Sequence, residues 1–120
     1  MRPFVSTLCL AGLLVSAAHA QNAEVFYERA MARYEIGDFA GAYTEFSAAG
    51  DAGHVRSQEI AGLMRLAGPL LYGAAVPRDD DAAMHWMLKA AAAGSEMAQH
   101  LTCAHARHIA PDTYAYCEVR

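Results

Sequence analysis

The residues that could do chemistry gather near the C-terminal end, where His100, Cys103, His105 and His108 fall within nine positions. Imidazole and thiolate groups are common ligands of zinc and copper, and His105 and His108 can share one helix face. The spacing around Cys103, however, does not place all four groups on one side of a helix. We therefore predict no metal site and no cofactor. Metal or ligand binding by this histidine cluster is kept as the alternative function.

Other candidate sites have simpler explanations. Asp79, Asp80 and Asp81 could attract calcium, but the spacing of an EF-hand loop is absent, and carboxylates in a row suit the start of a helix. The serines form no nucleophile elbow, and the residues around Gly73 lack the lysine and hydroxyl of a phosphate-binding loop. We therefore predict that the protein is not an enzyme and has no catalytic residues.

The first 20 residues have the composition of a signal peptide. Arg2 gives a positive start, and an apolar run of about 15 residues follows, which is short for a membrane span. Ala18 and Ala20 are small residues where a signal peptidase cleaves. We predict cleavage after Ala20 and a periplasmic or secreted protein; the rival interpretation is an uncleaved anchor or a buried helix.

The rest of the chain is long enough for one small domain. We assign residues 21–110 to a helical repeat domain and residues 111–120 to a C-terminal tail. The chain has a formal net charge of −4, and loss of Arg2 with the signal peptide makes it about −5. An acidic chain without a basic stripe argues against nucleic acid and against anionic membrane surfaces as partners.

Two cysteines remain after the predicted cleavage, Cys103 and Cys117. Export implies an oxidising compartment, and an even number of cysteines there favours pairing. We predict one disulfide that ties the tail to the last helix; two independent buried thiols are the alternative.

Glycine and proline divide the chain into segments of one helix length each, and no segment alternates with a period of two. Asn22, Asp38 and Ser95 are predicted N-caps. The five predicted helices cover residues 22–36, 38–49 and 53–67, a segment that begins at 79–81, and residues 95–108. This pattern predicts an all-α fold, a short α-solenoid of stacked antiparallel helix hairpins.

The two halves of the domain match each other at a shift of 41 residues. A period near forty residues is typical of stacked helical hairpins, since each hairpin needs a neighbour to cover its apolar face. The matching pairs are Asp38 and Asp79, Ala42 and Ala83, Ala49 and Ala90, Gly53 and Gly94, and Gln58 and Gln99.

Residues 72–79, with the sequence Tyr-Gly-Ala-Ala-Val-Pro-Arg-Asp, stand before a helix that carries alanines and a tryptophan. This stretch resembles the Sel-one-like repeat, a helical repeat related to the tetratricopeptide repeat, and the likeness extends over residues 30–101. Ala75, the lengthened connection at residues 66–71 and Cys103 depart from the family pattern. The positions that carry the resemblance are Gly62, Tyr72, Gly73, Pro77, Asp79, Ala83, Trp86, Ala90, Ala91, Gly94 and Ala98.

The resemblance implies structural roles for these residues: close helix approach at Gly62, a helix start at Pro77 and Asp79, and core packing by Trp86. Members of the family are mostly scaffolds and adaptors, so the likeness implies protein binding, with fold alone unable to fix function. In stacked hairpins the first helix of each pair lines a common face. Its polar residues are the predicted contacts with an unidentified protein or peptide, and self-association is a further expectation. These residues are Arg33, Arg56, Glu59 and Arg65.

Overall fold

The computed structural model describes residues 6–109 and residue 117, with side chains for residues 17–107 and Cys117. The chain is all-helical, as predicted, and no strand forms in this described part. Its helices are α1 (Ser6–Glu35), α2 (Phe39–Asp51), α3 (Val55–Ala67), α4 (Pro69–Tyr72), α5 (Asp80–Ala92) and α6 (Glu96–Ile109).

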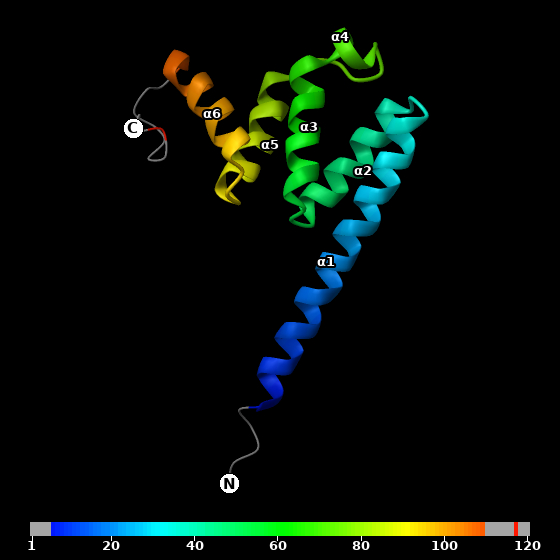
Figure 1. Cartoon of the computed structure of the whole chain (residues 1–120), viewed down its shortest axis with the longest axis vertical. Helices are drawn as coiled ribbons and strands as arrows, with labels where there is room; N and C mark the ends of the chain where they lie inside the picture. The colour runs from blue at the N-terminus through cyan, green and yellow to red at the C-terminus, as the bar shows by residue number, and fades with distance from the viewer. Residues whose placement is uncertain (1–5, 110–116, 118–120) are drawn as a thin grey trace.

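The long helices run alternately up and down, and each packs on the next long helix along the chain (Figure 1). The main contacts join α1 to α2, α2 to α3, α3 to α5, and α5 to α6, while the short α4 projects from the end of α3. The N-terminal half of α1 extends away from the stack (Figure 1). The molecule is therefore a short row of antiparallel helices with principal extents of 64 × 41 × 20 Å.

Two expectations about helix ends are wrong. The first helix does not begin at an Asn22 cap, because α1 starts at Ser6 and passes Asn22 without a break. No proline lies between Ser6 and Glu35, and alanine and leucine dominate the first half, so propagation continues through Asn22. The connection after α3 contains the additional helix α4, which starts at Pro69, a residue suited to the first helical position. Most of the predicted tail, residues 111–120, lies outside the described residues.

The 41-residue period is visible in the way helices start. The carboxylate of Asp38 accepts a hydrogen bond from the Gly41 amide at 3.0 Å, and that of Asp79 accepts one from the Ala82 amide at 3.0 Å. Each of these side chains satisfies an amide that the first turn of a helix leaves free. The predicted caps Asp38, Asp79 and, through its Oγ bond to the Ala98 amide, Ser95 are confirmed.

The same period recurs in the turns that end α2 and α5. Gly53 and Gly94 have φ of 91° and 97°, the left-handed region that glycine adopts without strain. After each turn a glutamine reaches back to the preceding helix. The amide of Gln58 donates to the Gly50 carbonyl at 2.9 Å, and that of Gln99 donates to the Ala91 carbonyl at 3.1 Å. One set of bonds thus fixes both junctions, α2 to α3 and α5 to α6.

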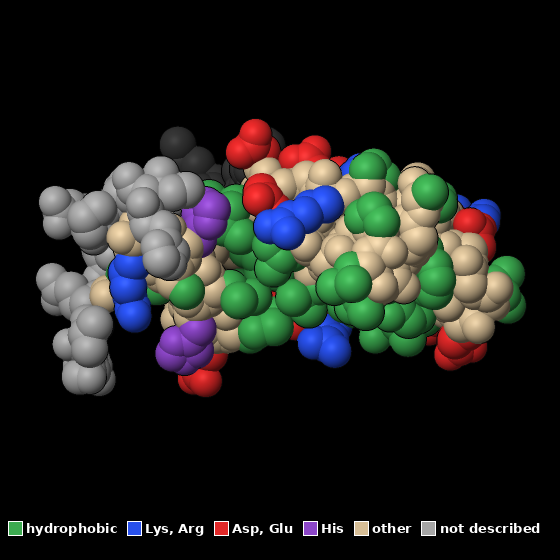
Figure 2. Space-filling view, turned by 90° about the horizontal axis from the view of Figure 1, so that it is seen from above, with side chains coloured by type: hydrophobic (Ala, Val, Ile, Leu, Met, Phe, Trp, Pro, Cys, Tyr) green, Lys and Arg blue, Asp and Glu red, His purple; other side chains and the backbone are tan. Residues whose placement is uncertain are grey.

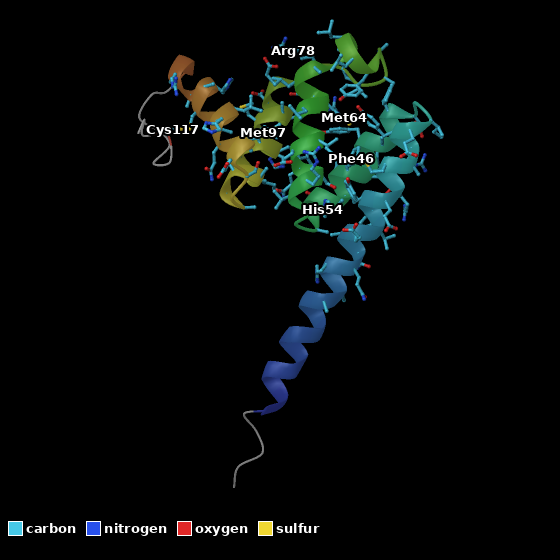
Figure 3. The ribbon with its side chains drawn as sticks, in the orientation of Figure 1. Phe46, His54, Met64, Arg78, Met97 and Cys117 are labelled. Carbon is cyan, nitrogen blue, oxygen red and sulfur yellow. A yellow bond between two sulfur atoms is a disulfide. The ribbon has the colours of Figure 1, made fainter. Side chains whose placement is uncertain are left out.

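The interior lies between the helices, where Phe46 of α2 and Met64 of α3 are fully buried side by side (Figure 3). Trp86 of α5 is 5% exposed, and its indole N–H donates to the hydroxyl of Tyr43 at 3.1 Å. The expected core role of Trp86 is therefore confirmed, and its one polar atom has a partner inside the stack. Val76, from the connection before α5, completes this cluster at 2% exposure.

Gly62 sets the distance between α3 and α5. A Cβ atom at this position would lie 2.6 Å from the Cε of Met87 and 3.2 Å from the carbonyl oxygen of Ala83. The side chain of Met87 is flexible, but the backbone of Ala83 is not, so α5 would have to move away. The close approach that the resemblance implies for Gly62 is therefore present in the structure.

We predict that Gly62→Val lowers the free energy of unfolding by about 2 kcal/mol, because it overpacks the α3–α5 contact with a β-branched side chain. Urea unfolding followed by circular dichroism measures the change. Ala92→Val, at an exposed position of α5, is the matched control and should cost well under about 1 kcal/mol. Equal effects of the two substitutions would contradict the role of Gly62.

The structure contains the predicted disulfide between Cys103 of α6 and Cys117, which lie 14 positions apart. Cys103 is 7% exposed, so its sulfur is held in the packed side of α6. The bond joins residues 14 positions apart, and such a cross-link restricts the unfolded chain more than the folded one.

We predict that Cys117→Ser lowers the free energy of unfolding by about 3 kcal/mol, the value expected for opening a loop of roughly 15 residues. Thermal unfolding with and without a thiol reductant measures it. The reductant should destabilise the unsubstituted protein to the level of the variant and leave the variant unchanged. A variant as stable as the oxidised protein would show that the disulfide contributes nothing.

Candidate binding groove

A hollow of about 260 Å³ lies between α1 and α3, above α2. Its walls come from the two helices that flank α2, and its floor comes from α2 itself. Most of its lining is apolar or aromatic. The lining residues are Met31 and Tyr34 of α1, Phe46 of α2, Arg56, Ile60 and Leu63 of α3, and Tyr72 of α4. We call this hollow the α1–α3 groove.

Aromatic rings hold one end of the groove in place. The ring of Tyr34 lies 6.3 Å from that of Phe46 and 6.0 Å from that of Tyr72, both edge to face. Tyr72 also packs edge to face on Phe39 at 5.1 Å, so the short α4 is anchored to the α1–α2 hairpin through its last residue. Such pairs prefer these tilted geometries, which makes this end of the groove preorganised.

The hydroxyl groups of Tyr34 and Tyr72 are 3.4 Å apart. Burial, together with the hydrogen bond to Tyr34, raises the pKa of Tyr72 to about 12. The neutral phenol is therefore the form that this end of the groove stabilises.

Of the four predicted contact residues, Arg56 is the one that lines the groove. Its guanidinium lies 3.0 Å from the carboxylate of Glu59, the next predicted contact residue. The other carboxylate oxygen of Glu59 accepts a hydrogen bond from the Ser95 hydroxyl at 2.6 Å. Glu59 therefore links α3 to the residue that caps α6, while Arg56 reaches the rim of the groove.

Arg33 and Arg65 take part in contacts within the fold. Arg33 donates to the carboxylate of Asp38 at 2.8 Å, and this bond holds the pKa of Asp38 below its usual range. The guanidinium of Arg65 lies 4.3 Å from the centre of the Tyr43 ring and donates to the Pro77 carbonyl at 3.1 Å. Both side chains therefore stabilise connections between helices and lie outside the groove lining. The sequence could not reveal these contacts.

The sequence did not identify Tyr34 and Ile60, which belong to two of the expected helices, as part of a binding surface. A stripe shows which side of a helix is apolar, but the packing partner of each position is set by the tertiary fold. The available signal was the order of the helices. Since α1 and α3 are each the first helix of a hairpin, they line the same face.

Among the described side chains, His100 and His105 do not assemble with Cys103 into a metal site. The sulfur of Cys103 is bonded to Cys117, His100 is exposed and His105 is half-buried. The side chain of His108 lies outside the described residues. Within residues 17–107 and Cys117, no three His, Cys, Asp or Glu side chains come together as metal ligands.

A larger and more open hollow of about 550 Å³ lies beside the turn between α2 and α3. His54, labelled in Figure 3, lines it and stacks on Tyr27 with 4.6 Å between ring centres. Its Nε2 lies 3.5 Å from a carboxylate oxygen of Glu24. Since His19 and Ala20 form part of the wall, the predicted cleavage after Ala20 would remove that part, and we do not treat this hollow as the site.

Comparisons of the chain with family models, curated proteins and solved structures find no match. The resemblance to the Sel-one-like repeat thus remains a prediction from the motif residues. Among the helices of the described part of the chain, none has both the length and the apolar character needed to span a bilayer.

The raised pKa of Tyr72 predicts how stability changes at alkaline pH. Because the folded-state pKa of about 12 exceeds the ordinary 10.0, the contribution is fully present below pH 10.0 and is lost as the pH rises through about 12. Tyr72→Phe should remove a late-titrating component from the tyrosinate absorbance and make the alkaline loss of stability less steep. Complete titration of every tyrosine near pH 10.0 in the folded protein would contradict this account.

Proposed function

We propose that the protein is an exported helical-repeat scaffold or adaptor that binds another protein through the α1–α3 groove. The observation that carries the proposal is an open, mostly apolar hollow walled by two rigid helices and braced by the aromatic contacts of Tyr34 and Tyr72. Helices that are already in place lose little conformational freedom when a partner docks.

The size of the groove favours a side chain of a partner protein over a free metabolite. Small-molecule sites usually enclose about 300–1,000 Å³ and carry several convergent polar groups. The α1–α3 groove has about 260 Å³, and its polar groups are two tyrosine hydroxyls and an arginine that is already paired. A hollow of this kind suits one or two apolar anchor side chains from a helix or an extended segment.

Two features of the chain support export and a scaffold role. The N-terminal 20 residues have signal-peptide composition, and the disulfide between Cys103 and Cys117 suits an oxidising compartment. The motif residues resemble a repeat family whose members are mostly scaffolds and adaptors. No observation favours the alternative of metal binding, because Cys103 is committed to the disulfide.

A charge placed inside the groove tests the proposal. The protein with its disulfide intact is used as bait in an affinity-capture experiment. The experiment is repeated with Ile60→Arg, which puts a cation between α1 and α3. Val25→Arg is the matched control, since Val25 is 50% exposed and does not line the groove. We expect the wild type and the control to retain the same bound protein and Ile60→Arg to lose it by about tenfold or more.

Circular dichroism should show all three baits equally helical, so that loss of binding is not loss of fold. Equal retention by wild type and Ile60→Arg would show that the groove is not the binding surface.

A further inference from the structure

The edge of the α1–α3 groove on α1 is acidic. Glu24, Glu28, Met31 and Glu35 follow one another at spacings of four, three and four residues, so they lie on one stripe of the helix. Met31 lines the groove, so the carboxylates of Glu28 and Glu35 lie along its rim on α1, while Glu24 lines the larger hollow beside His54. Glu28 and Glu35 are exposed, and neither forms an ion pair within the part of the chain that the structure describes.

The opposite edge supplies little positive charge to offset this rim. Arg56 is the one cation among the lining residues, and its guanidinium is paired with Glu59 at 3.0 Å. Within the described residues, the ion-pair partner of Glu24 is the imidazole of His54, at 3.5 Å. The rim of the groove on α1 therefore carries two carboxylates without an ion-pair partner among the described residues, in a chain whose formal net charge is −4.

Apolar surface continues beyond the groove onto α4. Leu70 and Leu71 are 87% and 65% exposed, and they directly precede Tyr72, which lines the groove. Figure 2 looks onto the end of the molecule that carries α4 and shows hydrophobic side chains spread across the middle and right of this end. Exposed leucines in this short helix add little to the core, and exposed apolar side chains next to a lining residue of an apolar groove favour an interaction site.

We propose that the α1–α3 groove binds a basic amphipathic segment of a partner protein. Apolar side chains one helical turn apart enter between Met31 and Ile60 and contact Leu70 and Leu71. Lysine or arginine side chains on the flank of the segment pair with the carboxylates of Glu28 and Glu35. This inference rests on the proposed function and adds the chemistry of the partner.

Charge complementarity selects this occupant over others. An acidic peptide and an anionic membrane surface would both meet the carboxylates of α1, and a second copy of this acidic chain would do the same. A basic segment is attracted electrostatically while it approaches the groove. It forms ion pairs with the rim once it is bound. Pairs at a solvent-exposed rim change affinity by about two- to fivefold each, while the apolar anchor supplies most of the binding.

The test compares two synthetic helical peptides with identical leucine positions, one with lysine and one with glutamate at every polar position. Fluorescence anisotropy measures their affinity for the full chain with its disulfide formed. We expect the lysine peptide to bind at least tenfold more tightly, and the difference to shrink as salt rises. Equal affinities, or no binding of either peptide, would overturn the inference.

Variants locate the effect. Glu28→Gln with Glu35→Gln should weaken the lysine peptide by about five- to tenfold. The matched control, Asp81→Asn with Glu96→Gln, removes the same charge from the starts of α5 and α6 and should change affinity less than twofold. Equal effects of the two double variants would mean that net charge alone attracts the peptide, which contradicts a docking site.

Ile60→Arg separates this inference from the proposed function. One outcome is that Ile60→Arg abolishes binding of the lysine peptide, while Glu28→Gln with Glu35→Gln leaves it unchanged. This outcome would keep the groove as a binding site and overturn its preference for a basic partner. Lysine-peptide binding that survives Ile60→Arg would overturn both.

Discussion

The close contact between α3 and α5 at Gly62 is the constraint on which the rest of the stack depends. With no side chain at that position, the backbone of Ala83 comes near enough for Trp86 to enter the core and donate to Tyr43. A wider separation would open a cavity around Trp86 and leave its N–H without a partner, and both changes cost stability. Small residues at the helix contacts are therefore as important as the large residues that fill the core.

The groove is a consequence of the same stacking. Both α1 and α3 pack on α2, and each meets it along its own apolar stripe, so a space remains between the two on the side away from α2. Phe46 closes that space from below, and the aromatic contacts of Tyr72 close one end. The fold thus produces a preorganised apolar surface without any element devoted to it.

Local signals predicted the fold well, and contacts between helices were the part that could not be foreseen. The caps Asp38, Asp79 and Ser95 depend on residues within three positions and were correct. Asn22 was wrong because the residues before it favour helix as strongly as those after it. The contacts of Arg65 are with Tyr43 and Pro77, which are distant in sequence, so the sequence alone could not reveal them.

The disulfide stands in a defined register of the helical repeat. Cys103 lies 41 positions after Gly62 and so occupies on α6 the place that Gly62 occupies on α3. A further helix could not settle against α6 as closely as α5 settles against α3, since a side chain stands in the way and is joined to Cys117. The position that lets two helices approach closely in the middle of the stack thus carries a covalent cross-link on α6.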